Sequence, residues 1–224
     1  MSNELLKLKL TEVIRNGMGY ITNRDIEKYI YDLLPESPSI LRELEHVART
    51  KRIPIVGPMV GRFLYILAAT TGAKHVLEIG TAIGYSAIWL GLAVKRNNGK
   101  VITIEIDENF TYEALKNIER MGLAKTIKVI NGDGLEVIEK IRRKFDIIFI
   151  DDNKQNYPKY LEPCSQRLHE NGLLVADNAL WNGEVALDIK SKDAKAIAKF
   201  NKSLMKRMFS VIIPARDGIA IGIK

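Results

Sequence analysis

The sequence contains few of the features that would cross-link, anchor or export a protein. Its 224 residues include one cysteine, Cys164, so this chain can form neither an internal disulfide nor a thiolate metal centre by itself. The longest apolar run, residues 63–69, is far shorter than the roughly 20 residues of a membrane span. The first ten residues lack the layout of a signal peptide. We therefore expect a cytoplasmic protein without a membrane partner.

Aromatic residues are also few, at 7% of the chain, but 46% of the residues are apolar and 27% are charged, as in ordinary globular domains. No repeat, low-complexity tract or flexible linker divides the chain. Apolar residues recur at helical spacing within residues 5–14, 26–34 and 39–49, which predicts helices there. We expect an N-terminal helical extension, residues 1–52, that serves as a lid or dimer contact, followed by one domain, residues 53–224.

Positive charge is concentrated near the C-terminus. The net charge is +7, and residues 190–224 account for all of it, with nine basic and two acidic side chains. Lysines recur there every three or four residues, on one face of a predicted helix: Lys192, Lys195, Lys199, Lys202 and Lys206. Such a stripe can follow nucleic-acid phosphates, but a solvated lysine face is common, and few aromatic residues accompany this one.

From residue 74 onward, short apolar runs alternate with helical patterns. The runs at residues 75–79, 101–106, 126–130, 145–150 and 173–176 read as buried strands, with a helix predicted at residues 157–169 before the last of them. Apolar strands separated by helices are typical of a parallel sheet covered on both faces. Residues 208–213 and 219–223 read as a closing hairpin, so the last strand runs antiparallel. We expect a doubly wound, Rossmann-like α/β fold with seven strands.

A glycine-containing loop follows the first strand. In VLEIGTAIGYSAIWL, Gly80 and Gly84 permit a tight turn into the next helix, and Ser86 lies in the first turn of that helix. Loops of this kind bind many nucleotide ligands, although some only turn a corner. The loop therefore indicates a cofactor site without identifying the cofactor.

Acidic residues near this loop narrow the choice of cofactor. Glu105 ends the next strand, where a carboxylate can accept hydrogen bonds from ribose hydroxyls, and Asp133 follows the third strand within reach of an adenine. Glu78 would repel a pyrophosphate but attract the sulfonium and ammonium groups of S-adenosylmethionine. The dinucleotide pattern G-x-G-x-x-G is absent from the loop. S-adenosylmethionine is therefore favoured over NAD, and a methyltransferase over a dehydrogenase.

Two later strands end in side chains that carry oxygen donors. Asp151 follows one strand, and Asp177 and Asn178 follow the next, so all three are expected at the carboxyl edge of the sheet. Such donors suit Mg²⁺, Mn²⁺ or Ca²⁺ and not zinc. Lys154 lies three residues after Asp151, where a bound ion would lower its pKa and fit it for proton abstraction. The simpler interpretation is structural: Asp177 and Asn178 form a turn, Asp151 caps a helix, and Lys154 makes a surface ion pair.

Taken together, these segments resemble the cation-dependent O-methyltransferases, the family of the catechol and caffeoyl-CoA O-methyltransferases. The resemblance covers roughly residues 40–224 and is carried by four motifs: EIGTAIGYSA, FIDxxKxxY at residues 149–157, DNxLWxGxV at residues 177–185 and IIPxxDGIAI at residues 212–221. It implies the class I methyltransferase fold and a homodimer. It also implies S-adenosylmethionine as methyl donor, a divalent cation, Mg²⁺ first among them, and a catechol-like aromatic acceptor with vicinal hydroxyls.

The resemblance also implies roles for individual residues. It implies cofactor contacts at Val56, Glu78, Gly80, Ser86, Glu105 and Asp133, metal ligation by Asp151, Asp177 and Asn178, and Lys154 beside Asp151 as base or orienting cation. Within the family, the pattern is most similar to bacterial enzymes that methylate 5-hydroxyuridine in tRNA, which makes tRNA the alternative acceptor. A cofactor-binding protein without catalysis is the alternative of another class.

Overall fold

The computed structural model describes residues 24–187 and 189–224, so the helix expected at residues 5–14 lies outside the described residues. The helices are α2 (Arg24–Leu33), α3 (Ser39–Lys51), α4 (Gly57–Thr70), α5 (Tyr85–Lys95), α6 (Glu108–Arg120), α7 (Gly134–Lys140), α8 (Tyr157–Arg167) and α9 (Lys192–Arg207), with the 3₁₀ helices η1 (Lys154–Asn156) and η2 (Trp181–Ala186). The strands are β1 (His75–Ile79), β2 (Lys100–Glu105), β3 (Ile127–Asn131), β4 (Phe145–Ile150), β5 (Leu168–Ala176), β6 (Phe209–Ile213) and β7 (Ile219–Ile223). No described helix is both long enough and apolar enough to cross a membrane.

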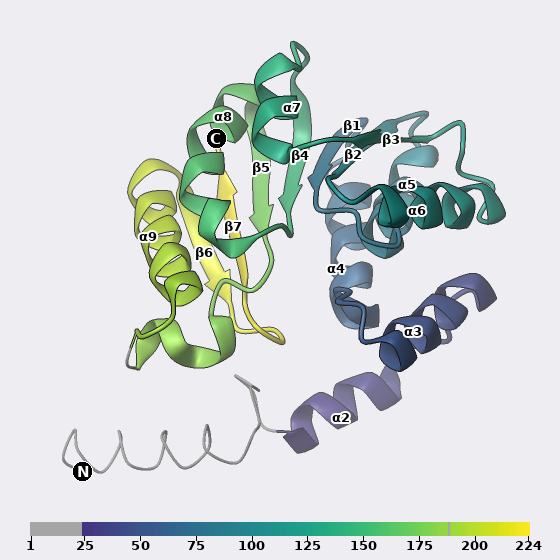
Figure 1. The fold of residues 1–224 in the computed structure, drawn as a ribbon, viewed down its shortest axis with the longest axis horizontal. Coiled ribbons are helices and arrows are strands. Elements are labelled where there is room, and N and C mark those ends of the chain that lie inside the picture. Colours follow the sequence, from purple (N-terminus) through teal and green to yellow (C-terminus); the bar gives the residue numbers. More distant parts are fainter. Residues whose placement is uncertain (1–23, 188) are drawn as a thin grey trace.

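The strands form one seven-stranded sheet in the order β3-β2-β1-β4-β5-β7-β6 (Figure 1). Strands β3, β2, β1, β4 and β5 run parallel, whereas β7 is antiparallel to both of its neighbours, β5 and β6. The expected doubly wound fold with an antiparallel last strand is confirmed. The strand order reverses between β1 and β4, and ligands of such sheets bind outside the carboxyl ends of the strands at that point.

Most predicted boundaries lie within one residue of those in the structure, but the boundary between the helix at residues 157–169 and the strand that follows it is wrong. Helix α8 ends at Arg167, and β5 begins at Leu168, so residues 168–169 belong to a strand and not to the predicted helix. The first part of β5 contains exposed polar residues at positions 169–171, and its pairing with β4 shifts register between Phe145 and Ile147. An exposed, bulged strand end has no apolar run, which is why the pattern began only at residue 173.

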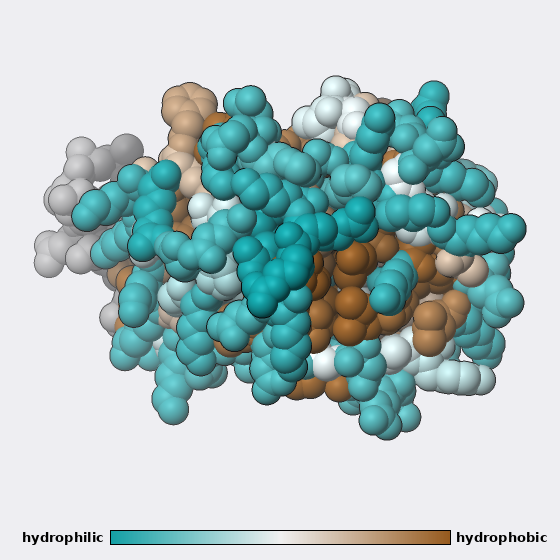
Figure 2. Space-filling view, turned by 90° about the horizontal axis from the view of Figure 1, so that it is seen from above, coloured by the Kyte–Doolittle hydropathy of each residue, from teal (hydrophilic) through white to brown (hydrophobic). Residues whose placement is uncertain are grey.

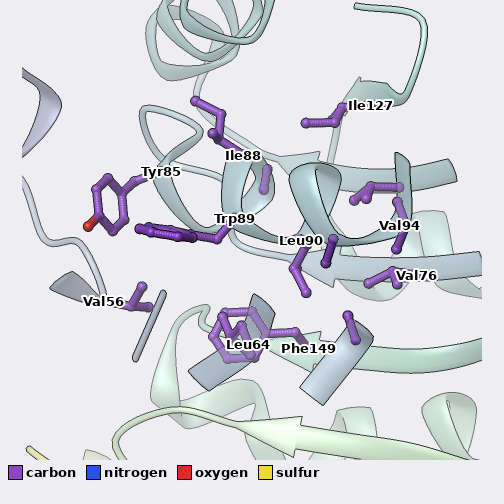
Figure 3. Close-up of a cluster of buried hydrophobic side chains, with 14 of the residues drawn as sticks. Val56, Leu64, Val76, Tyr85, Ile88, Trp89, Leu90, Val94, Ile127 and Phe149 are labelled. Carbon is purple, nitrogen blue, oxygen red and sulfur yellow. The ribbon is translucent and has the colours of Figure 1, made fainter. Parts of the chain in front are cut away.

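Helices cover both faces of the sheet and bury two apolar clusters. Leu64 of α4 and Leu90 of α5 pack on one face with Val76 and Phe149 of the strands, as Figure 3 shows. Leu77 and Ile148, each adjacent in sequence to one of these strand residues, belong to the second cluster, with side chains of α8 and α9. Both faces of the central strands are therefore buried, which directs ligands to the strand ends.

The surface opposite the β6–β7 turn is mostly polar. Figure 1 shows β7 ending at the upper end of the sheet near the C-terminus, whereas the turn that precedes β7 lies at the lower end of the sheet. Figure 2 views the molecule from above, and hydrophilic side chains there surround one apolar area. Because β4 and β5 run in the direction opposite to β7, this end carries their amino ends and lies away from the edge at which a ligand is expected.

We expect Gly61→Ala to destabilise the packing of α4 on α5. A Cβ atom at position 61 would lie 2.3 Å from Cδ1 and Nε1 of the buried Trp89 ring, so the ring or the helix must move. Overpacking of this kind costs about 1–3 kcal/mol of the free energy of unfolding, measurable by urea denaturation. In a Trp89→Leu background the same change should stabilise the protein, because alanine forms helix better than glycine by about 1 kcal/mol. A loss of the same size in both backgrounds would contradict the steric explanation.

Candidate active site

A cavity of about 580 Å³ lies outside the carboxyl ends of the strands. Eight of the ten site residues expected from the sequence line it: Val56, Gly80, Ser86, Glu105, Asp151, Lys154, Asp177 and Asn178. The other two, Glu78 and Asp133, do not line the cavity. The parallel register explains the gathering, since Ile79 pairs with Ile150, and Ile150 pairs with Ala176, so the residues that follow these strands meet at one edge.

The loop after β1 approaches the chain after β4 so closely that only glycine fits. Gly80 has a φ of +97°, and a Cβ atom there would lie 2.0 Å from the carbonyl oxygen of Asp151. Gly84, with a φ of +86°, precedes the first residue of α5. The two glycines thus let the loop pack against the Asp151 backbone and turn into α5 at the edge of the cavity.

Glu105 supports this loop from β2. Its Oε2 accepts hydrogen bonds from the backbone N–H groups of Thr81 (3.2 Å) and Ala82 (2.7 Å), and its Oε1 accepts one from Asp107 (2.9 Å). Sequence reasoning missed this structural role and expected only contacts with a ribose. Each carboxylate oxygen has two lone pairs, so Glu105 can hold the loop and still accept from a ligand hydroxyl in the cavity.

Glu78 lies fully buried on β1, beneath the loop and not in the cavity wall. Its Oε2 accepts a hydrogen bond from Thr103 Oγ1 (2.5 Å), whereas its Oε1 is buried without a hydrogen-bond partner. Burial raises the pKa of Glu78 to about 8, against the opposing effect of the Thr103 hydrogen bond and of the nearby Ser86 hydroxyl. A cation nearby would favour its ionised form.

Asp133 and Val56 both stand at helix starts. Asp133 is the N-cap of α7, and its Oδ1 accepts hydrogen bonds from the backbone N–H groups of Leu135 (2.8 Å) and Glu136 (3.1 Å). Val56 precedes α4 and is buried at the cavity wall. The structure therefore gives Asp133 a capping role that the sequence pattern did not distinguish from ligand binding.

Asp177 carries a buried oxygen without a partner. Its side chain is 3% exposed, and its Oδ1 has no hydrogen bond. Burial, together with the negative charge of Asp151, raises the pKa of Asp177 above its usual range. An unpaired carboxylate oxygen in such a place is costly unless a cation binds it. This observation fits the expected divalent ion.

The donor set around Asp177 suits a hard cation. No group of three His, Cys, Asp or Glu side chains within residues 24–187 and 189–224 could hold a metal ion, so two carboxylates would need a donor of another type. Asn178 supplies an amide oxygen next to Asp177, and Asp151 lines the same cavity directly after the neighbouring strand β4. Two carboxylates and one amide oxygen, completed by water, suit Mg²⁺, Mn²⁺ or Ca²⁺.

Lys154 is held by two neighbours. Its Nζ donates to Asp151 Oδ1 (2.7 Å) and to the hydroxyl oxygen of Tyr157 (3.0 Å). The buried Tyr157 hydroxyl lies 3.1 Å from the carbonyl oxygen of Asp177 and 3.3 Å from that of Ile150, so it links the ends of β4 and β5. The motif at residues 149–157 includes this tyrosine, but sequence reasoning gave it no role in the site. The Lys-x-x-Tyr spacing was a usable signal, because residues three apart on a helical turn face each other.

Known proteins resemble this chain in sequence and in structure. A family model described as O-methyltransferase matches residues 33–224. Catechol O-methyltransferase of Niastella koreensis is 33% identical over 186 residues, which cover 80% of this chain and 84% of the relative. Caffeoyl-CoA O-methyltransferase 1 of Zea mays is 30% identical over 216 residues, covering 88% and 83%. The crystal structure of the O-methyltransferase from Bacillus cereus in complex with SAH matches with a TM-score of 0.80 at 31% identity, over 89% of this chain and 97% of that one.

These matches include the strand ends, the glycine loop and the closing hairpin, which carry the sequence motifs. The matched residues 33–224 make up most of the chain. The relationship expected from the motifs is thereby confirmed at the level of the family. This chain belongs to the O-methyltransferase family.

Proposed function

We propose that this O-methyltransferase transfers the methyl group of S-adenosylmethionine to a metal-chelated hydroxyl of a catechol-like aromatic molecule in the cytoplasm. The observation that carries the proposal is the buried, unpartnered Oδ1 of Asp177, next to Asn178 and across from Asp151. The relatives of this chain include a catechol O-methyltransferase. The similar Bacillus cereus enzyme was crystallised with SAH, which is the product left when S-adenosylmethionine loses its methyl group.

The cofactor would occupy the part of the cavity next to β1 and β2. Gly80 and Ser86 offer close backbone approach and a hydroxyl, and Glu105 offers carboxylate oxygens to a ribose. Val56 would cover the cofactor from the start of α4. Glu78 would act from beneath the loop through its charge, and Asp133 from the edge of the site. These roles agree with a cofactor that carries positive charge.

Metal binding is assigned to Asp151, Asp177 and Asn178. When bound, a divalent ion supplies Lewis acidity that lowers the pKa of a chelated hydroxyl. Lys154, held by Asp151 and Tyr157, would keep the acceptor oxygen in line with the donor methyl group, either as an orienting cation or as the base whose Nζ takes the proton of the acceptor hydroxyl. The transfer joins opposite charges, so a site that excludes water favours it.

The N-terminal extension, residues 1–52, would act as a lid or as a contact in a homodimer, ahead of the methyltransferase domain, residues 53–224. Helix α2 supports this proposal with large apolar side chains that remain exposed. Ile26, Tyr29 and Leu33 are 54%, 64% and 63% exposed, and their spacing places them along one side of the helix. A second surface, from the same chain or a partner copy, would bury them.

A tRNA 5-hydroxyuridine remains the second candidate acceptor, because α9 offers a basic surface that starts at the cavity. Asp193 in the first turn of α9 lines the cavity. All five lysines of the stripe are exposed, at positions 192, 195, 199, 202 and 206. They could follow a phosphate backbone away from the site, and each phosphate contact would add salt-dependent affinity.

We expect transfer of a labelled methyl group to a catechol in the presence of Mg²⁺ and none in EDTA. The same reaction offered hydroxyuridine-containing tRNA tests the second acceptor, with a Lys199→Glu/Lys202→Glu variant as a control that should affect only tRNA. Label that appears on tRNA alone and is lost in that variant would show that the methyl acceptor is tRNA and not a catechol. Transfer that survives EDTA would refute the metal mechanism for either acceptor. Bound cofactor without transfer to either would favour a non-catalytic protein.

A further inference from the structure

The turn between β6 and β7 contacts both halves of the candidate active site. It contains Arg216, with a φ of +51°, followed by Asp217 and Gly218. The backbone of the turn is held against the segment after β5, since the N–H groups of Ala179 and Leu180 donate to the carbonyl oxygens of Gly218 and Asp217, both at 2.8 Å. The turn therefore has a defined position beside Asn178.

The side chain of Asp217 limits how the Asn178 amide can point. Its Oδ2 accepts a hydrogen bond from Asn178 Nδ2 (3.3 Å), and its Oδ1 accepts one from the backbone N–H of Asn182. A carboxylate can only accept, whereas an amide has one donating and one accepting end. Asn178 must therefore direct its NH₂ group at Asp217, which leaves its Oδ1 free for another partner.

Arg216 extends from the same turn toward the cofactor half of the site. Its guanidinium donates to the backbone carbonyl oxygens of Val56 and of Ile55 (3.3 Å). It lines both the active-site cavity and a neighbouring cavity of about 1070 Å³ between α2, α3 and α4. Arg216 therefore fixes the loop that places Val56 at the cavity wall.

We propose that this turn is the positioning element of the active site, with Asp217 directing the oxygen of Asn178 toward the metal and Arg216 holding the Val56 loop against the cofactor. This inference rests on the proposed function. Neither residue is assigned a contact with the reacting atoms. Asp217 acts through Asn178, which is assigned to the metal, and Arg216 acts through Val56, which is assigned to the cofactor. The two effects can therefore be measured separately, one by metal binding and the other by cofactor binding.

The near-isosteric Asp217→Asn variant tests the metal half. The amide introduced at position 217 must keep its oxygen toward the N–H of Asn182, so its NH₂ group faces Asn178. Asn178 must then turn its oxygen toward that NH₂ group, which points the NH₂ group of Asn178 toward the ion. We expect the Kd for Mn²⁺, measured by electron paramagnetic resonance without cofactor or acceptor, to rise about 10- to 100-fold, the usual effect of an outer-shell partner. The Kd for SAH, measured by calorimetry, should stay unchanged.

Two further variants make this test specific. Arg216→Met should raise the Kd for SAH about tenfold, because the two hydrogen bonds to the carbonyl oxygens of Ile55 and Val56 are lost. It should not weaken Mn²⁺ binding, because the substitution removes positive charge near Asp177. The double variant Asn178→Asp/Asp217→Asn should recover Mn²⁺ binding, since a carboxylate at position 178 accepts from the new amide at position 217 with one oxygen and binds the ion with the other.

The outcomes separate this inference from the proposed function. Wild-type protein that binds no Mn²⁺ at millimolar concentration would refute the metal site itself, and with it the role of Asp217. Wild-type protein that binds Mn²⁺ while Asp217→Asn binds it equally well would overturn only the positioning role. If Asp217→Asn fails to fold, the double variant decides: recovered fold and Mn²⁺ affinity support the amide orientation, and recovered fold without affinity overturns it.

Discussion

Replacement of Asp177 by asparagine is expected to abolish methyl transfer and to leave the protein folded and more stable. The side chain is buried and feels the negative charge of Asp151, which the charges of Arg216 and Lys154 and a backbone hydrogen bond from Asn178 offset only in part. Asparagine keeps the shape and removes the charge that a divalent ion needs. Loss of that ion removes several kcal/mol of transition-state stabilisation, which corresponds to a fall in kcat of about 1000-fold or more.

Three measurements check this expectation. Initial rates with labelled S-adenosylmethionine give kcat, calorimetry with SAH tests whether the cofactor half is intact, and thermal unfolding without metal should give a higher Tm. Asp146→Asn is the matched control, on the strand that precedes Asp151. Asp146 accepts hydrogen bonds from the backbone N–H groups of Lys74 and His75, both at 2.8 Å, so its loss should lower Tm and leave kcat unchanged. An Asp177→Asn enzyme that keeps Mg²⁺-dependent turnover would contradict the metal assignment.

The position of this metal site could be predicted from the sequence because it follows from topology. Apolar runs identify parallel strands, and the carboxyl ends of such strands meet at one edge, so Asp151, Asp177 and Asn178 had to lie together there. No distance or contact was needed for that inference. The same rule placed Gly80 and Glu105 at the cavity, although it could not show that Glu105 holds the glycine loop through backbone N–H groups.

The contacts that orient these residues could not be predicted in the same way. Asp217 lies 39 residues from Asn178, and Arg216 lies 160 residues from Val56, so no local spacing connects them. Glu78 presents a different difficulty. All residues of β1 after His75 are buried, because helices cover both faces of the sheet, and a strand buried on both faces shows no alternation that would tell which way a side chain points.

Replacement of Glu78 by glutamine is expected to weaken cofactor binding and to stabilise the free protein at alkaline pH. The pKa of Glu78 is raised from 4.5 to about 8, chiefly by burial. A carboxyl group whose pKa is higher in the folded state stabilises that state fully below its unfolded pKa, and this stabilisation is lost as the pH rises through about 8. The free energy of unfolding should therefore fall between pH 5 and pH 9, by on the order of 4 kcal/mol at most.

Glu78→Gln removes the group that titrates, so the fall in stability over this range should become smaller. The exposed Glu136→Gln on α7 is the control, and it should retain the wild-type pH dependence. Urea denaturation at several pH values, without cofactor, measures the difference. A Glu78→Gln protein with the same pH dependence as wild type would show that Glu78 titrates normally and is not the buried acid described above.

The same acid links cofactor charge to proton release. Near neutral pH the free protein holds Glu78 mainly protonated, whereas a sulfonium and an ammonium group nearby favour its ionised form. S-adenosylmethionine binding should therefore release a proton, visible as a dependence of the calorimetric enthalpy on the buffer, and affinity should increase as the pH rises toward 8. Glu78→Gln should lose the proton release and bind about 10- to 100-fold more weakly, since one or two charge interactions at low dielectric are removed. Unchanged affinity would mean that the cofactor's charges lie beyond the reach of Glu78 and are balanced by groups in the cavity wall instead.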